Sequence, residues 1–199
     1  IGTRFLLDTL VQHGQGELAY TVATQRTYPS WGFMIENGAT TIWELWRLAT
    51  GPGMNSHNHP AFGFISSWFY ETLVGLRPLQ GWRRFVVQPH ILGDLTWAEA
   101  RVQTPLGLVY CRWERQPSCL NLILTIPPCA QATLYLPTLE FQQPTIVERD
   151  MVLWKEGRLC RSRPTIRGGE HNAHWVRFEI DSGRYEFQVL GQALQGFSG

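Results

Sequence analysis

Two carboxylates between residues 28 and 59 lie among apolar residues, a setting that suits acid–base chemistry. Glu36 follows two apolar residues, and Glu44 lies between two Trp residues in the sequence IWELW. A carboxyl group among indoles is partly desolvated, which raises its pKa and allows it to exchange protons near neutral pH. We therefore consider a catalytic role for Glu44. The alternative is structural, with the carboxylate accepting hydrogen bonds from backbone N–H groups of the turn at 38–41.

The segment NSHNH, residues 55–59, contains side chains that suit a sugar ligand. Neutral His and Asn side chains offer both donors and acceptors, and sugar hydroxyls need both. His57 and His59 also raise the question of a metal, but no third ligand of convincing spacing follows them. The alternative is a helix N-cap, in which Asn58 or His59 satisfies N–H groups of the first turn. We expect no metal, and the sequence carries no phosphate-binding or dinucleotide-binding motif, so we expect no cofactor.

The stretch from Tyr28 to His59 is aromatic, but it contains too many Gly, Asn and Pro residues to form one helix. It holds three of the nine Trp residues of the chain. A Trp side chain combines a flat apolar face with one N–H donor, which suits a sugar ring as well as a protein core. We therefore predict that this stretch lines a pocket.

Helical patterns lie on both sides of this stretch. Apolar residues recur at helical spacing over residues 3–13 and 16–25. A third helix is predicted to begin near His59, with Pro60 at its first position, where the missing N–H costs nothing. Its end is marked by Pro78.

The hydrophobic pattern then changes from helical spacing to alternation, interrupted by Gly and Pro turns. Eight short strands in such an arrangement predict an antiparallel sandwich. The predicted strands cover residues 83–90, 96–105, 107–116, 119–128, 132–139, 145–154, 174–180 and 184–190. The sequence thus indicates two domains, with helices over 1–78 and a β-sandwich over 79–199.

Composition excludes several classes of partner. The chain has 199 residues and a net charge of +1, which argues against nucleic acid, because phosphate binding requires a strongly basic surface. No apolar run is long enough to span a membrane, so we expect no membrane partner. The four cysteines are expected to be free thiols packed in the sandwich. Free thiols and the lack of a leader sequence favour the cytoplasm and leave secretion open.

Several motifs in order resemble the bacterial α-L-rhamnosidases of glycoside hydrolase family 78. They are SWGFMIENGATTIWELW (30–46), GMNSHNHPAFGFISSWFYETLVGLRP (53–78), RRFVVQPHILGDLTWAEARVQTPLGLVYCRW (83–113) and IPPCAQATLYLP (126–137). The resemblance implies an α+β multidomain protein, in which the last helices of an (α/α)6 toroid precede an antiparallel β-sandwich. It also implies hydrolysis of terminal α-L-rhamnose from glycosides with inversion, which requires two carboxyl groups.

The resemblance also implies roles for individual residues. Glu44 matches the general base of the family, and His59 matches a His that helps to bind rhamnose. We expect four neighbouring residues to contribute to substrate binding: Trp31, Glu36, Trp43 and Asn58. A rhamnose-containing glycoside is therefore the expected partner.

The chain departs from the family in one important respect. The general acid of the family lies well before the matching stretch, and nothing in this sequence matches it. We therefore expect this chain to be the C-terminal portion of a rhamnosidase and to be inactive by itself, since general acid catalysis typically contributes about 10²–10⁴-fold to the rate.

Two other interpretations remain open. In the first, the chain is a non-catalytic carbohydrate-binding module, which exposed Trp residues on one sheet face would favour. The candidates are Trp97, Trp113 and Trp154, although a core position is the commoner explanation for each. In the second, the helices expose an apolar face that pairs with another copy of the chain to form a homo-oligomer.

Overall fold

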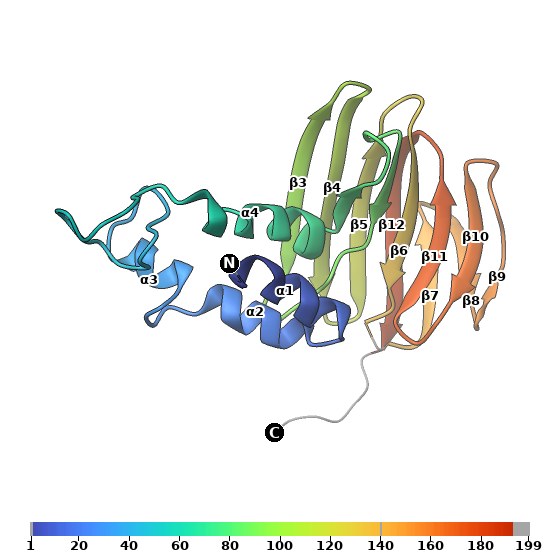
Figure 1. Ribbon diagram of the computed structural model, residues 1–199. Coiled ribbons are helices and arrows are strands. Elements are labelled where there is room, and N and C mark those ends of the chain that lie inside the picture. The colour runs from blue at the N-terminus through green and yellow to red at the C-terminus, as the bar shows by residue number, and fades with distance from the viewer. Residues whose placement is uncertain (1, 140, 193–199) are drawn as a thin grey trace. The chain divides into compact units, whose positions relative to one another are not determined.

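The computed structural model describes residues 2–139 and 141–192, and it contains two compact units, Ile1–Phe69 and Tyr70–Gly199. Figure 1 shows helices and irregular segments in the first unit and strands in the second. None of the helices in the described residues is long and apolar enough to cross a membrane.

Two of the predicted helices are confirmed. Helix α1 spans Thr3–Gln12 and buries Leu7, and helix α2 spans Gly16–Thr24 and buries Ala19 and Ala23. The two alanines are four residues apart and therefore lie on one face of α2.

The stretch after α2 contains a short helix that the sequence did not predict. Helix α3 spans Trp31–Glu36, and its first turn is capped by Ser30, whose Oγ accepts a hydrogen bond from the backbone N–H of Phe33 at 2.9 Å. A Ser cap satisfies one of the N–H groups that a helix start leaves without partners.

The third predicted helix begins as expected at Pro60 but is divided into three segments. A 3₁₀ turn spans Pro60–Phe62, helix α4 spans Ile65–Trp68, and a π-helical segment spans Phe69–Val74. Gly75 follows at a φ of 85°, a left-handed conformation that other residues rarely adopt.

The second unit is built from two sheets whose apolar faces form a common core. Figure 1 shows the strands of this unit as arrows and labels β3 to β12. The five-stranded sheet has the order β1 (Leu76–Pro78), β2 (Arg84–Val87), β6 (Gln131–Pro137), β11 (Trp175–Ile180) and β10 (Ile166–His171). The seven-stranded sheet has the order β3 (Trp97–Thr104), β4 (Gly107–Gln116), β5 (Cys119–Ile126), β12 (Gly183–Gln192), β7 (Gln142–Glu148), β8 (Met151–Lys155) and β9 (Arg158–Leu159).

The pairings confirm the predicted fold class. Neighbouring strands pair antiparallel, except that β2 runs parallel to β6. Alternation along the strands decides which face is buried: in β5, Leu120, Leu122, Leu124 and Ile126 all point into the core. The rings of Phe178 and Phe187 stack at 6.5 Å between their centroids, which brings β11 of one sheet against β12 of the other.

The strand prediction was wrong at four places. Residues 145–154 form parts of two strands, β7 and β8, because the chain turns at Arg149 and Asp150. Strands β1 and β9 were missed because each has at most three residues. Strand β10 was missed because it contains Gly168 and Gly169, which lie at a bulge in its pairing with β11.

The expectation that all four cysteines pack inside the sandwich was wrong for two of them. All four are free thiols; Cys111 and Cys119 are buried, whereas Cys129 and Cys160 are exposed. Burial raises the pKa of the Cys111 thiol to about 12, so this thiol is neutral and unreactive. Cys129 lies between β5 and β6 at a φ of 64°, in a turn rather than in the core.

His90 makes the stability of the second unit depend on pH. Its ring contacts Trp175, with the centroids 5.3 Å apart. Burial, together with the positive charge of Arg77, lowers the pKa of His90 from its ordinary value of 6.5 to about 4. Between these two values the unfolded chain binds a proton that the folded chain does not bind, so stability is lost as the pH falls.

We expect the free energy of unfolding to decrease by about 2–3 kcal/mol between pH 7.5 and pH 4.5 because of His90. Urea unfolding at the two pH values measures this decrease. The variant His90→Gln, which does not titrate, should lose this part of the pH dependence. An equally steep dependence in His90→Gln would show that another group is responsible.

Candidate functional site

Two irregular segments of the first unit are held together by backbone hydrogen bonds. The N–H of Glu44 donates to the carbonyl of Ser56 at 3.1 Å, and the N–H of His59 donates to the carbonyl of Ile42 at 2.8 Å. The hydroxyl of Thr41 also donates to the carbonyl of His57. These bonds bring the segments 41–44 and 56–59 side by side and thereby place Glu44 next to His59.

The Glu44 carboxylate lies between two polar side chains. Its Oε2 is 3.7 Å from Nδ1 of His59, and its Oε1 accepts a long hydrogen bond from Nδ2 of Asn55 at 3.4 Å. The distance to His59 is that of an electrostatic contact rather than of a hydrogen bond. The side chain of Glu44 is 26% exposed and that of His59 is 30% exposed, so a ligand or a water molecule can reach both of them.

An aromatic cluster lies next to this pair. The ring of His59 contacts Phe62 at 5.4 Å, Phe62 contacts Trp46 at 4.2 Å, and Trp46 contacts Trp31 at 5.0 Å, all between centroids. Nε1 of Trp31 donates to the carbonyl of Phe62 at 3.0 Å. A continuous row of rings therefore leads from His59 into the first unit and fixes the position of the histidine ring.

The predicted site residues Trp31 and Trp43 are buried in the first unit. Trp31 is 8% exposed and Trp43 is 4% exposed. The backbone N–H of Trp43 points to Sδ of Met34 at 3.3 Å, which ties the residue before Glu44 to helix α3. A direct contact of either Trp with a substrate stays a prediction.

The remaining two predicted residues lie in other surroundings. Glu36 pairs with Arg26, with Oε1 and Nη1 3.0 Å apart. Within the described part of the chain, Glu36 forms no hydrogen bond or ion pair with the residues around Glu44. Asn58 is exposed, and its backbone N–H donates to Oγ of Ser56 at 3.1 Å. Their contribution to substrate binding also stays a prediction.

Sequence reasoning missed Trp46 and Phe62, which connect His59 to Trp31. Trp46 has a φ of 60°, an uncommon conformation for a residue with a large side chain. The signal was present in the sequence, because Trp46 follows Glu44 by two residues and Phe62 follows His59 by three. Aromatic residues this close in sequence to predicted site residues are candidates for packing around the site.

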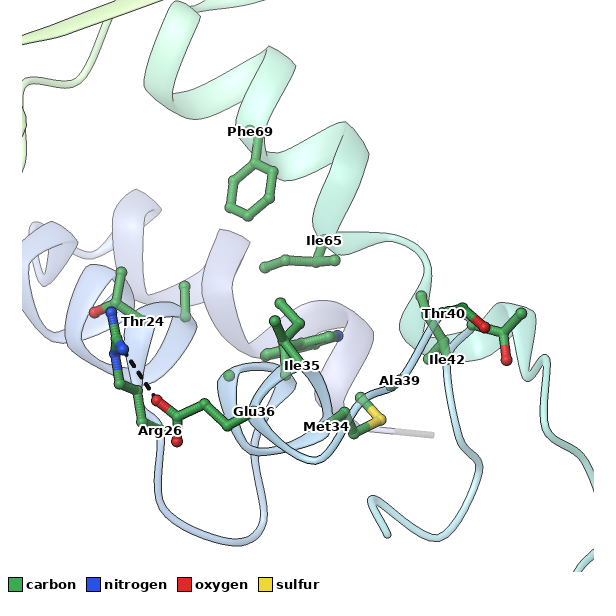
Figure 2. Close-up of a pocket in the computed structure, with 14 residues that line it drawn as sticks. Thr24, Arg26, Met34, Ile35, Glu36, Ala39, Thr40, Ile42, Ile65 and Phe69 are labelled. Carbon is green, nitrogen blue, oxygen red and sulfur yellow. Dashed lines mark hydrogen bonds and ion pairs between the residues drawn. The ribbon is translucent and has the colours of Figure 1, made fainter. Parts of the chain in front are cut away.

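Glu36 contributes to the lining of a cavity of about 500 Å³ in the first unit. Figure 2 shows Glu36 joined to Arg26 on one side of this cavity and the side chains of Ile65 and Phe69 on another. Met34, Ile35 and Ile42 add to its largely apolar lining. This cavity does not include Glu44 among its lining residues, so it is distinct from the surroundings of the Glu44–His59 pair.

The chemistry of the Glu44–His59 pair suits a sugar better than a metal ion. Within residues 2–139 and 141–192, no three His, Cys, Asp or Glu residues are grouped so that they could hold a metal. A carboxylate can accept a proton from a water molecule, and a neutral imidazole can both donate to and accept from a hydroxyl group.

Two family models match the chain, and together they cover most of it. Residues 1–73 match the bacterial alpha-L-rhamnosidase 6 hairpin glycosidase domain, and residues 75–149 match the bacterial alpha-L-rhamnosidase C-terminal domain. An alpha-L-rhamnosidase of Formosa agariphila is 32% identical over 196 residues, which are 95% of this chain and 20% of that protein. An alpha-L-rhamnosidase of Alteromonas sp. is 39% identical over 134 residues, which are 64% of this chain and 15% of that protein.

Solved structures with the same fold are also alpha-L-rhamnosidases. The alpha-L-rhamnosidase from Dictyoglumus thermophilum matches with a TM-score of 0.84 and 34% identity, over 96% of this chain and 20% of that one. The Streptomyces avermitilis alpha-L-rhamnosidase complexed with L-rhamnose matches with a TM-score of 0.78 and 29% identity, over 94% of this chain and 17% of that one. The chain thus spans about a fifth of the length of these proteins.

Proposed function

Because this chain belongs to the bacterial α-L-rhamnosidase family, we propose that it contributes part of the active site of an enzyme that cleaves terminal α-L-rhamnose from glycosides. The chain matches the C-terminal portion of such enzymes, from the glycosidase domain into the C-terminal domain. The observation that carries the proposal is the open Glu44 carboxylate beside His59.

In the proposed reaction, Glu44 is the general base. Its carboxylate removes a proton from a water molecule while the water oxygen forms a bond to the anomeric carbon of rhamnose. The bond from this carbon to the leaving oxygen breaks, and that oxygen takes a proton from a general acid. Water and leaving group are on opposite faces of the sugar ring, so the anomeric configuration is inverted.

We propose that His59 has a different role, which is to bind a rhamnose hydroxyl. Its Nδ1 faces Glu44 at 3.7 Å, and its Nε2 would form the hydrogen bond to the sugar. The contact with Phe62 holds the ring in this orientation. His59 thus positions the sugar and contributes to the electrostatic field around the base.

The isolated chain is proposed to be inactive. The resemblance to the family assigns the general acid to a region before the stretch that matches this chain, and inverting enzymes need both carboxyl groups about 6.5–9.5 Å apart.

Homo-oligomerisation through the helices and a cytoplasmic location likewise stay predictions.

Calorimetric titration of L-rhamnose into the 199-residue chain tests whether the Glu44–His59 pair is a sugar site. We expect binding in the millimolar range that is roughly tenfold weaker in His59→Ala and Glu44→Ala, because each loses a hydrogen-bonding partner of the sugar. His13→Ala, which removes an exposed His at the end of α1, is the control and should bind as the wild type does. Equal affinities in all variants would place the sugar elsewhere, and no heat at tens of millimolar would mean that the pair alone is not a site.

A further inference from the structure

One Trp residue of the sandwich is exposed on a strand at the edge of its sheet. Trp97 begins β3, the first strand in the order of the seven-stranded sheet, and is 53% exposed. Trp113 and Trp154, by contrast, are 0% and 4% exposed. A single exposed apolar side chain is common on protein surfaces, so the residues around this ring decide whether it marks a binding surface.

The exposed ring is held in place by a network of charged side chains. The guanidinium of Arg112 lies over one face of Trp97, 5.1 Å from the ring centroid. Arg112 in turn donates to Glu99 on β3 and to Glu114 on β4, both at 3.2 Å. Arg101 also donates to Glu99 at 3.1 Å. A ring supported on one face in this way presents its other face with little conformational freedom to lose on binding.

Residues that suit hydroxyl groups continue from Trp97 across the sheet. In the pairing register, Trp97 lies opposite Glu114, Glu114 opposite Asn121, and Asn121 opposite Gln188. Nε2 of Gln188 donates to Oδ1 of Asn121 at 3.0 Å. Four neighbouring strands span about 14 Å, which is roughly the length of two or three sugar rings. We name Trp97, Glu114, Asn121 and Gln188 the outer row.

The charges next to the outer row indicate the kind of ligand. Two positive residues, Arg101 and Arg112, are matched by two negative residues, Glu99 and Glu114. Because these positive and negative charges cancel, they would not attract a phosphate backbone or another polyanion, which requires an excess of positive charge. Amide and carboxylate groups beside a flat aromatic face suit a neutral molecule that is rich in hydroxyls.

We propose that the outer row is a binding site for a neutral glycan, separate from the Glu44–His59 pair. One sugar ring stacks on the face of Trp97 opposite Arg112. Its hydroxyls and those of the next ring form hydrogen bonds with Glu114, Asn121 and Gln188. Such a site would hold a polysaccharide to the protein while its ends are cleaved elsewhere.

The test is an NMR titration of the 199-residue chain with two probes, methyl α-L-rhamnopyranoside and the neutral oligosaccharide cellotetraose. The indole N–H signal of Trp97 is assigned by its loss in Trp97→Ala. We expect this signal to shift saturably with at least one probe. The affinity of that probe should fall at least fivefold in Trp97→Ala and in Asn121→Ala. It should be unchanged in Leu108→Ala, which removes an exposed apolar side chain from another part of β4.

A variant of the other proposed site, Glu44→Gln, separates this proposal from the proposed function. Binding measured at the Trp97 signal should be the same in Glu44→Gln as in the wild type, whether or not Glu44 is the catalytic base. The absence of any shift with either probe at about 20 mM, which would nearly saturate a site with a Kd on the order of 1 mM, would overturn the proposal. It would also be overturned if size-exclusion chromatography showed a dimer that Trp97→Ala dissociates, because a second copy would then cover the ring.

Discussion

Replacing Glu44 with Gln is expected to lower kcat by about 10²–10⁴-fold in an α-L-rhamnosidase that contains this chain, because Gln cannot accept the proton of the attacking water. The host for this experiment is the Dictyoglumus thermophilum enzyme, in which the matching fifth of the chain is replaced by this sequence. The TM-score of 0.84 at 34% identity supports such a replacement. The isolated chain, assayed alongside, should release no product above the buffer rate.

A chemical rescue distinguishes loss of the base from loss of structure. In Glu44→Ala of the same chimera, azide can attack the anomeric carbon without giving up a proton. The bond to the leaving oxygen breaks, the general acid protonates that oxygen, and the product is the rhamnosyl azide of inverted configuration. Glu156→Gln, a change in an exposed side chain next to β8, serves as the control and should leave kcat unchanged. A loss of less than tenfold in Glu44→Gln, or the absence of rescue by azide, would remove Glu44 from the role of base.

The second large effect concerns the core of the sandwich. Trp113 is fully buried, and its Nε1 donates to the carbonyl of Leu73 at 2.7 Å. Trp113→Ala removes a large core side chain and leaves this carbonyl without its donor. We expect the free energy of unfolding to decrease by about 3–5 kcal/mol, as measured by urea denaturation followed by circular dichroism.

Two other variants give the comparison that this prediction needs. Trp97→Ala removes the same side chain from an exposed position on the neighbouring strand and should cost about 0.5–1 kcal/mol, the contribution of its contact with Arg112. Trp113→Phe keeps much of the packing and should cost less than Trp113→Ala. If the exposed and the buried Trp→Ala variants were equally stable, the assignment of Trp113 to the core would be wrong.

The sequence predicted those parts of the fold in which local pattern and burial agree. Strand β5 was predicted because four apolar residues alternate along it, and α1 and α2 were predicted because their spacing is helical. The turn between β7 and β8 was not predicted, because Arg149 takes a φ of 50° where a Gly would have given a signal. Strand β10 contains two Gly residues, so its local sequence has a low propensity for a strand. It forms because it pairs with β11, and this pairing cannot be predicted from local propensity.

The candidate site was predictable as a set of residues but not as a geometry. Glu44 and His59 are brought together by backbone hydrogen bonds between irregular segments, which no periodic pattern predicts. Their sequence context made both residues candidates, and the resemblance to a family implied their roles. The resemblance could not indicate that Glu36, also a carboxylate among apolar residues, pairs with Arg26 and lines a different cavity. The different surroundings of these two carboxylates could therefore be seen only in the structure.

The place of β12 in its sheet has a consequence for how the protein is made. This strand, formed by the last described residues, lies between β5 and β7 and pairs with both of them. During translation, β5 and β7 leave the ribosome well before the strand that joins them. Until it arrives, each has an unpaired edge of the kind that invites aggregation. The seven-stranded sheet therefore stays incomplete until β12 has been synthesised. Chaperones that shield strand edges would have their largest effect during that interval.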